Sequence, residues 1–215
     1  GLHRIDALFH LDSGRLYHRE YTSPHLLQVN ERMKINGIDI SNEELLTLAE
    51  SVRLAVEEMS DPPTEFERIT AMDLLYFQRR ACQVVVLEVG LGGRLDATNV
   101  IPAPDAAVIA NIALEHTAVL GNTLEQIARE KAGIIKKGSS VVLYRQSPSV
   151  EAVVRDVCQQ QGASLFVTDP ARGRTVSRTL EGQTLNYWDR NHLFLPLPGA
   201  YQAKNAFAAL EAVDA

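Results

Sequence analysis

Residues 84–99, VVVLEVGLGGRLDATN, decide the fold class of this chain. Their first four side chains form an apolar run, which predicts a parallel strand buried on both faces. Gly90, Gly92 and Gly93 then predict a sharp turn, where the backbone can come close to another part of the molecule. A strand that ends in such a turn is typical of open α/β sheets, which hold ligands at the carboxyl ends of their strands.

Glu88 stands at the end of this predicted strand. A carboxylate in that place needs a partner that offsets its lost hydration. A metal ion facing phosphate oxygens is one such partner. A hydrogen bond from the local backbone is the other, and the stretch alone leaves both interpretations open.

The apolar periodicity predicts further strands and helices along the chain. Strands are expected at 106–112, 141–144 and 164–168, and helices at 123–135 and 150–161. Two earlier helices are expected, one capped by Ser41 or Asn42 and one running from the capping box Thr64-x-x-Glu67 to about residue 82. This alternation predicts an α/β fold with a mostly parallel sheet flanked by helices.

The pattern changes after residue 173. Residues 174–195 alternate polar and apolar side chains around two turns, which predicts a small antiparallel meander near the C-terminus. An Ala-rich helix is expected over 202–215. We therefore divide the chain into an atypical N-terminal segment, 1–20, and a central domain, 21–215, that includes the meander as a subdomain.

The composition excludes several classes of protein. Of the 215 residues, 46% are hydrophobic, which is enough for one large domain. A net charge of −6 argues against a nucleic-acid partner, and no apolar run is long enough to span a membrane. Cys82 and Cys158 show no metal-binding or redox spacing. We expect a cytoplasmic protein.

His116 and Lys131 are the next candidates for chemistry. His116 follows the second predicted strand, so one strand–helix–strand passage would bring it to the same sheet edge as Glu88. It can be a metal ligand, a general base or a hydrogen-bonded structural residue. Lys131 lies on the apolar stripe of the helix expected at 123–135, where an ammonium is costly. It must pair with a carboxylate, extend to the surface or be chemically modified.

Two polar segments leave alternatives open. Ser23 lies in the turn YTSPH, residues 21–25, and can offer a hydroxyl to a metal or phosphate or be an ordinary turn residue. Gln202 and Asn205 lie in the first turn of the last predicted helix. Their amides can cap the backbone or contact a nucleotide base.

Together these segments resemble the folylpolyglutamate synthase and dihydrofolate synthase family, the folate branch of the Mur-type ATP-dependent amide ligases. The matching segments are YTSPHL at 21–26, NERMKING at 30–37, EVGLGGRLDATNV at 88–100, HT at 116–117, LG at 120–121, AREKAGIIK at 128–136 and LPG at 197–199. The resemblance is nearly continuous from residue 21 to residue 215. Segments 21–26 and 30–32 are similar to the folate branch rather than to the ligases of cell-wall precursors.

The resemblance implies a reaction. ATP and Mg²⁺ would activate a carboxylate of dihydropteroate or a folate as an acyl phosphate, which the amine of L-glutamate then attacks. It implies magnesium ligands at Ser23, Glu88 and His116, a catalytic role for His116, and a carbamylated, catalytic Lys131. The enzyme would be a monomer with no nucleic-acid or membrane partner.

The resemblance also implies the binding residues. Gln202 and Asn205 would contact ATP. The side facing the folate would comprise four residues of the segment 21–37: Thr22, Pro24, His25 and Arg32.

The departures from the family pattern matter for activity. The family's phosphate loop is expected about two dozen residues before Tyr21, and residues 1–20 do not resemble the helix that follows that loop; the family's C-terminal domain is also missing from this sequence. Glu115 stands where the family usually has Asp, and Ala200-Tyr201 stand where an Arg-His pair is common. We therefore expect an incomplete, weakly active or inactive ligase fragment. A non-catalytic remnant or binding module of the same fold is the alternative.

Overall fold

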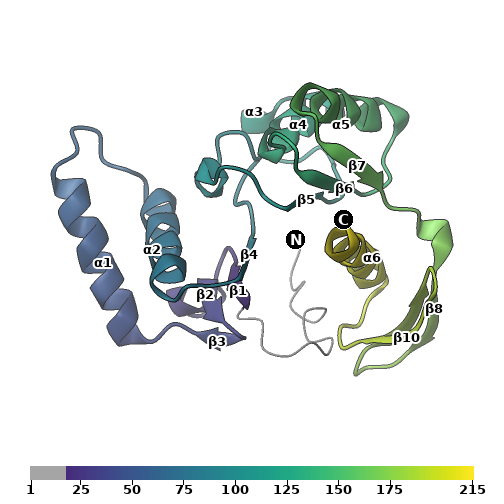
Figure 1. The fold of residues 1–215 in the computed structure, drawn as a ribbon, viewed down its shortest axis with the longest axis horizontal. Coiled ribbons are helices and arrows are strands. Elements are labelled where there is room, and N and C mark those ends of the chain that lie inside the picture. The colour runs from purple at the N-terminus through teal and green to yellow at the C-terminus, as the bar shows by residue number, and fades with distance from the viewer. Residues whose placement is uncertain (1–17) are drawn as a thin grey trace. The chain divides into compact units, whose positions relative to one another are not determined.

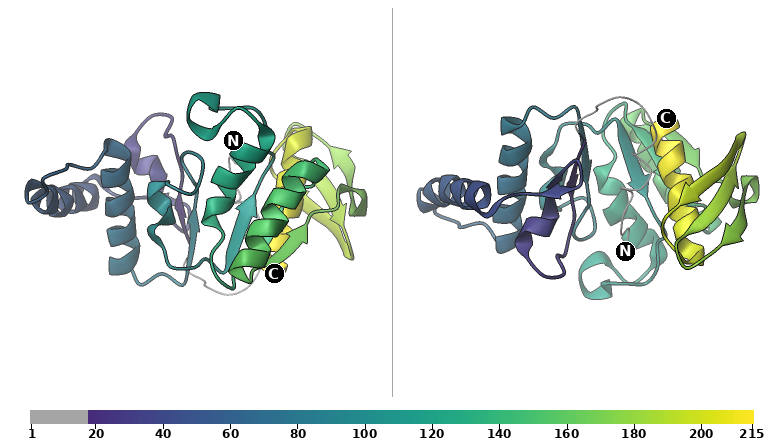
Figure 2. Two further views of the ribbon diagram at one scale, coloured as in Figure 1. Left: turned by 90° about the horizontal axis from the view of Figure 1, so that it is seen from above. Right: turned by 90° about the horizontal axis from the view of Figure 1, so that it is seen from below.

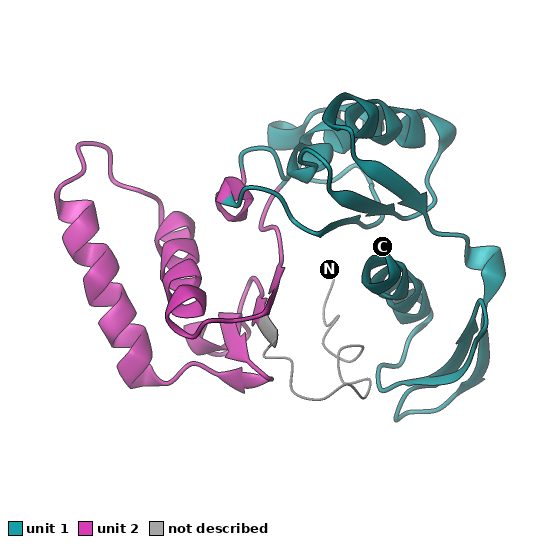
Figure 3. Ribbon diagram, in the orientation of Figure 1, with its two compact units in different colours: residues 1–11, 92–95, 101–215 teal, residues 12–91, 96–100 magenta. Residues whose placement is uncertain are grey.

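The structure, a computed structural model, describes residues 18–215 of the chain and its side chains from residue 20. These residues form two compact units (Figure 3). Unit 2 comprises residues up to 91 together with 96–100, and unit 1 comprises 92–95 and 101–215. The predicted N-terminal segment 1–20 lies outside the described residues except for 18–20, which belong to the first strand.

Unit 2 contains a four-stranded mixed sheet and two helices (Figure 1). The strand order is β3-β2-β1-β4, in which β1 and β4 are parallel and the other pairs are antiparallel. The elements are β1 (His18–Tyr21), η2 (Val29–Arg32), β2 (Met33–Ile35), β3 (Ile38–Asp39), α1 (Asn42–Glu57), α2 (Glu65–Arg79), β4 (Val84–Leu87) and η3 (Ala97–Val100).

The helices of unit 2 begin where local sequence predicts. The Ser41 side chain accepts a hydrogen bond from the Glu44 backbone N–H at the start of α1. Thr64 and Glu67 form the predicted capping box at the start of α2. The second helix ends at Arg79 rather than near residue 82, because Ala81 takes a left-handed conformation with a φ of 47°.

The prediction of a fully buried strand at 84–87 was wrong. Among the described residues β4 is an edge strand of its four-stranded sheet, and Val85 is 39% exposed. Leu87 does pack against the core of unit 2, whose buried members include Tyr21 and Met33. An edge strand can bury one face while the other stays open, so apolar character alone overestimated its burial.

Unit 1 contains a three-stranded parallel sheet, an antiparallel meander and the remaining helices. The parallel sheet has the order β5-β6-β7, and the meander has the order β10-β9-β8. The elements are β5 (Ala106–Ile109), α3 (Thr117–Leu120), α4 (Leu124–Lys131), η4 (Ala132–Ile134), β6 (Ser140–Leu143), α5 (Pro148–Gln161), β7 (Ser164–Val167), η5 (Pro170–Arg172), β8 (Gly173–Arg178), β9 (Gln183–Tyr187), β10 (Arg190–Leu195) and α6 (Ala200–Asp214).

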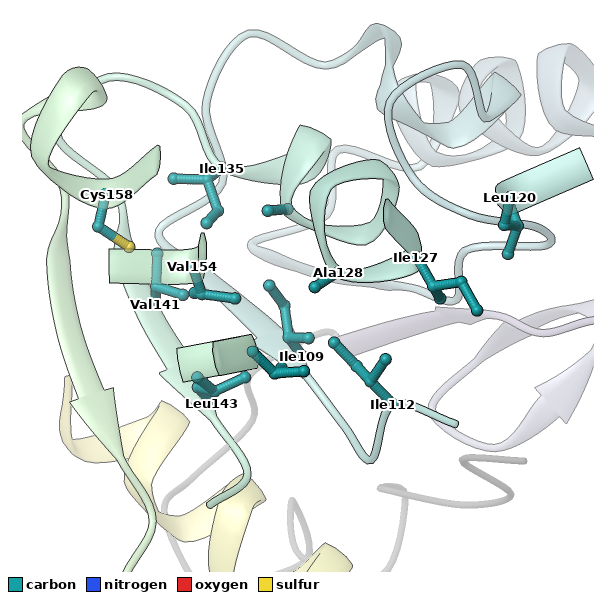
Figure 4. Close-up of a cluster of buried hydrophobic side chains, with 12 residues drawn as sticks. Ile109, Ile112, Leu120, Ile127, Ala128, Ile135, Val141, Leu143, Val154 and Cys158 are labelled. Carbon is teal, nitrogen blue, oxygen red and sulfur yellow. The ribbon is translucent and has the colours of Figure 1, made fainter. Parts of the chain in front are cut away.

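Alternate side chains of β6 face opposite sides of the parallel sheet. Val141 and Leu143 join the buried cluster formed with α4 and α5 (Figure 4). Val142, and Tyr144 directly after the strand, join a second cluster with Ala208 of α6. Helices therefore cover both faces, as Figure 1 shows. This buried arrangement is the reason that strands in this sheet are almost continuously apolar.

Helix α6 also covers the meander. Figure 2 shows it (yellow) beside the meander strands, and its Phe207 ring stacks on Tyr187 of β9 with ring centroids 4.3 Å apart. Leu185 and Leu195 complete this core from the strands. The small residues of α6 therefore serve two packing surfaces of unit 1.

The predicted fold class is confirmed, with corrections to its details. The parallel sheet flanked by helices and the antiparallel meander are both present. The predicted strand 106–112 ends at residue 109, and the helix predicted over 123–135 gives way to a 3₁₀ turn after Lys131. β4 and β5 belong to different sheets rather than to one. None of the helices in residues 18–215 is long and apolar enough to cross a membrane.

Candidate functional site

Ser23 and Glu88 meet at the carboxyl ends of the parallel pair β1 and β4. The Glu88 backbone N–H donates to the Tyr21 carbonyl at 2.9 Å, which extends the ladder by one residue. The Glu88 Oε2 atom accepts a hydrogen bond from the Ser23 backbone N–H at 2.9 Å. The backbone partner that the sequence left as an alternative is therefore present for one carboxylate oxygen. Oε1 accepts no hydrogen bond from any described residue, so it is available to a ligand.

The loop after Ser23 is organised by Glu31. Its Oε2 atom accepts from the Leu26 backbone N–H at 2.8 Å, and its Oε1 atom accepts from the N–H groups of Leu27 and Gln28, each at 2.9 Å. These bonds, from Leu26 first, lower the pKa of Glu31 below its usual range. Glu31 was missed as a site residue, although its spacing of three from Gln28 is that of the capping box it forms.

The four residues expected on the folate side lie around this loop. Arg32 Nε donates to His25 Nδ1 at 3.0 Å. The Thr22 hydroxyl points to the Glu31 carbonyl, while Pro24 is exposed. The structure therefore brings these residues together in unit 2.

Asp96 organises the glycine turn and was also missed. Its Oδ2 atom accepts from the backbone N–H groups of Gly90 and Leu91, at 3.0 and 2.9 Å. Its Oδ1 atom accepts from the Thr98 N–H at 3.0 Å and the Thr98 hydroxyl at 2.6 Å. Local Asp-to-backbone bonds of this kind are typical of turns, so the Asp-Ala-Thr spacing was a usable signal.

In unit 1 the glycine turn makes the close approach that its composition predicts. A Cβ atom on Gly93 would lie 2.9 Å from the carbonyl oxygens of Glu130 and Lys131. The Arg94 backbone N–H donates to the Glu130 carbonyl at 2.9 Å. The neighbour that requires glycine is thus the last turn of α4, which carries Lys131.

Lys131 is paired with a carboxylate. Its Nζ atom lies 3.2 Å from Glu115 Oε1, and its side chain is 24% exposed. Of the three interpretations open for Lys131, the structure shows the ion pair. His116, next to Glu115, is exposed; it is the N-cap residue of α3 and has a left-handed φ of 49°. Its imidazole makes no hydrogen bond with any described residue, which leaves the ring nitrogens accessible.

Gln202 and Asn205 form a polar chain with Tyr144. Tyr144 Oη donates to Asn205 Oδ1, and Asn205 Nδ2 donates to Gln202 Oε1 at 3.1 Å. Neither side-chain amide caps the backbone at the start of α6. The N-cap residue of this helix is Gly199, and no side-chain hydrogen bond caps the helix there. The backbone-capping interpretation is therefore wrong. Asn205 lies in the second turn of α6, since the helix begins at Ala200.

The predicted metal ligands are divided between the units. Ser23 and Glu88 lie in unit 2, whereas His116 lies in unit 1. Within residues 18–215, no group of three or more His, Cys, Asp or Glu side chains is arranged to hold a metal. Ser23 offers a hydroxyl rather than one of these four kinds of side chain, so the three ligands stay a prediction.

Known proteins are similar to this chain in sequence and fold. Residues 33–213 match the family model described as the Mur ligase middle domain. The chain is 39% identical over 204 residues to the dihydrofolate synthetase of Saccharomyces cerevisiae, across 91% of this chain and 45% of that protein. It is 37% identical over 203 residues to the folylpolyglutamate synthase of Lacticaseibacillus casei, across 89% of this chain and 47% of that protein.

Solved structures agree with the sequence comparison. A folylpolyglutamate synthase in complex with AMPPCP and folate has a TM-score of 0.84 to this chain at 35% identity, over 93% of this chain and 51% of that one. The chain thus spans about half the length of these relatives. It belongs to the Mur ligase middle-domain family, in the group of folylpolyglutamate and dihydrofolate synthases.

Proposed function

We propose that this chain supplies the central domain of an ATP-dependent ligase that joins L-glutamate to a carboxylate of a folate or dihydropteroate. The observation that carries the proposal is the meeting of Ser23 and Glu88 at the carboxyl ends of two parallel strands. Open α/β sheets bind ligands at that place. The similarity to a synthase in complex with AMPPCP and folate supports the same assignment.

The residues present fit a magnesium ion. One carboxylate oxygen of Glu88 accepts no hydrogen bond from the described residues. The other accepts from the backbone N–H of Ser23, so the residue that carries the hydroxyl is a direct neighbour of the carboxylate. Mg²⁺ prefers oxygen ligands and usually takes only one or two from carboxylates, with phosphates and water supplying the rest. These are the residues of unit 2 that would hold it, and His116 of unit 1 stays the third predicted ligand. When bound, Mg²⁺ would neutralise charge on the phosphates during phosphoryl transfer.

The chain's own residues would perform the other tasks. Gln202 and Asn205 would bind the base of ATP, and Thr22, Pro24, His25 and Arg32 would line the folate side. Glu31 would keep the folate-side loop in one conformation through its three backbone bonds. Alignment of the two substrates in this way accounts for a large part of catalysis in phosphoryl and acyl transfer.

Lys131 would act after modification. As a cation it pairs with Glu115. Its amine must lose a proton before it attacks CO₂, which forms a carbon–nitrogen bond and releases a second proton to give a carbamate. The product is an anion, so the pair with Glu115 would break and the new carboxylate would be able to act near a metal.

The first test is nucleotide binding by the chain itself, measured by calorimetry with ATP in the presence and absence of Mg²⁺. We expect binding that depends on Mg²⁺ and that weakens at least tenfold in Glu88→Gln, because the substitution removes the ligand charge. Glu58→Gln, at an exposed carboxylate of the same unit, is the matched control. Mg²⁺-independent binding, or none, would favour a non-catalytic module of the same fold.

The second test is catalysis. ATP-dependent transfer of radiolabelled L-glutamate to dihydropteroate, or to a reduced folate, would establish the reaction and identify the preferred acceptor. Because this chain alone is expected to be weakly active or inactive, the assay uses an active version of the protein; transfer of L-glutamate to another class of acceptor, and to neither of these two, would contradict the proposed substrate class.

A further inference from the structure

A buried tyrosine terminates the polar chain on α6. Tyr144 follows β6 and is 8% exposed. Its backbone N–H donates to the Ile109 carbonyl at 3.0 Å, so the residue continues the ladder between β5 and β6. Its ring packs against Val142 and Ala208. The phenol is therefore held by both the sheet and α6, at the carboxyl end of the central strand.

The phenol determines the direction of the hydrogen bonds. Burial raises the pKa of Tyr144 well above its ordinary value, so the hydroxyl keeps its proton and can donate. It donates to Asn205 Oδ1, which leaves Nδ2 of the same amide to donate to Gln202 Oε1. With the Asn205 amide rotated by 180°, its NH₂ group would donate to the phenol oxygen, and the buried phenol proton would have no acceptor among the described residues.

The hydrogen-bonded series from Tyr144 through Asn205 to Gln202 consequently ends in N–H groups. Gln202 uses its carbonyl oxygen to accept from Asn205, so its Nε2 atom is the remaining polar end. No described residue accepts a hydrogen bond from that nitrogen. Both amides are only partly buried, so the donors are accessible from solvent. An amide donor of this kind complements a ring nitrogen of a base, and it does not complement an exocyclic amine.

We propose that Tyr144 is a positioning residue for nucleotide recognition: its hydroxyl orients the Asn205 and Gln202 amides so that they donate to a ring nitrogen of a purine base. The inference rests on the proposed function, in which Gln202 and Asn205 contact the base of ATP. To that function the inference adds that the amides donate to the base, and that Tyr144 is the residue that makes them donors.

The test compares ATP with analogues that lack one ring nitrogen. Mg²⁺ complexes of ATP, 1-deaza-ATP, 3-deaza-ATP and 7-deaza-ATP are titrated into the 215-residue chain and into Tyr144→Phe. Tyr187→Phe is the matched control, since it removes another buried hydroxyl in unit 1, one that donates to Glu211 at 2.6 Å. Thermal unfolding of each variant shows whether a change in binding comes from a loss of fold.

We expect one deaza analogue to bind the unmodified chain and Tyr187→Phe roughly three- to tenfold more weakly than ATP, the effect of one neutral hydrogen bond. In Tyr144→Phe that ratio falls to less than about twofold, because the amides can rotate. A purely structural role would weaken ATP and its analogues equally. An unchanged ratio in Tyr144→Phe, or equal binding of all analogues to the unmodified chain, overturns the inference.

A second variant covers the case in which Tyr144→Phe unfolds. Asn205→Asp keeps an acceptor for the phenol but cannot donate to Gln202, so Gln202 must turn its NH₂ inward and its carbonyl outward. The analogue preference should again disappear, and its persistence contradicts the proposal. If the unmodified chain binds Mg²⁺-ATP but shows these contrary results, only the inference about Tyr144 fails. If it binds no ATP, the proposed function fails with it.

Discussion

Replacement of Leu143 by alanine should destabilise unit 1 strongly. Leu143 is 0% exposed and packs in the cluster between the parallel sheet and helices α4 and α5 (Figure 4). The substitution removes three buried carbon groups, which corresponds to about 2.4 kcal/mol of lost transfer free energy at ~0.8 kcal/mol each. β6 has ladder partners on both sides, so the site can collapse little and a cavity term adds to the loss.

We therefore expect the free energy of unfolding to fall by about 3–5 kcal/mol. For a chain of this length the melting temperature should fall by roughly 6–20 °C. Leu180→Ala is the control, because Leu180 is 98% exposed and should change stability by no more than about 0.5 kcal/mol.

The measurement is urea unfolding followed by tryptophan fluorescence. Trp188 is the single tryptophan of the chain and lies in unit 1, so its emission reports that unit. A loss smaller than about 1 kcal/mol for Leu143→Ala, or one equal to that of Leu180→Ala, would refute the packing described for this sheet.

Two further predictions concern the site. Lys131→Ala should abolish glutamate transfer in an active version of the protein. It should lower the melting temperature by no more than a few degrees, because the ion pair of Lys131 with the half-exposed Glu115 is worth about 0–1 kcal/mol. Lys137→Ala, at an exposed lysine, is the control, and full turnover in Lys131→Ala would exclude the carbamate role. The Glu31 carboxylate has a pKa below the ordinary 4.5, so its contribution is present above pH 4.5 and is lost as the pH falls through the lowered value. Hydrogen exchange at the Leu26 amide, corrected for intrinsic rate, should therefore lose protection below about pH 4.5, and protection that persists at pH 2 would show that other contacts hold the loop.

Most secondary structure could be predicted because its causes are local. The start of α2 is determined by a capping box whose two members, Thr64 and Glu67, are three residues apart in the sequence. The meander strands follow from alternation and turns, which also depend on neighbouring residues. Helix ends were predicted less accurately. The 3₁₀ turn after Lys131 contains Gly133, which lies so close to the distant Arg94 that a Cβ atom on Gly133 would be 2.4 Å from the Arg94 Cα atom.

The candidate site was predicted only in part. The sequence identified Glu88 and Lys131 because each places a charge in an apolar pattern, where a partner must offset the lost hydration. Their partners, the Ser23 amide and Glu115, could not be predicted from spacing. Glu31 had a usable local signal, whereas Tyr144 had none.

By itself, the sequence determined the fold class, the positions of most strands and helices, and the need for glycine at the turn, because each depends on side chains within a few residues of one another. Only the tertiary structure decided that β4 lies beside β1 at an edge of the sheet within residues 18–215, that Lys131 pairs with Glu115, and that Tyr144 donates to an amide 61 residues away. Such contacts depend on which surfaces the packed helices and sheets bring together. That outcome belongs to the whole chain, and no local pattern encodes it.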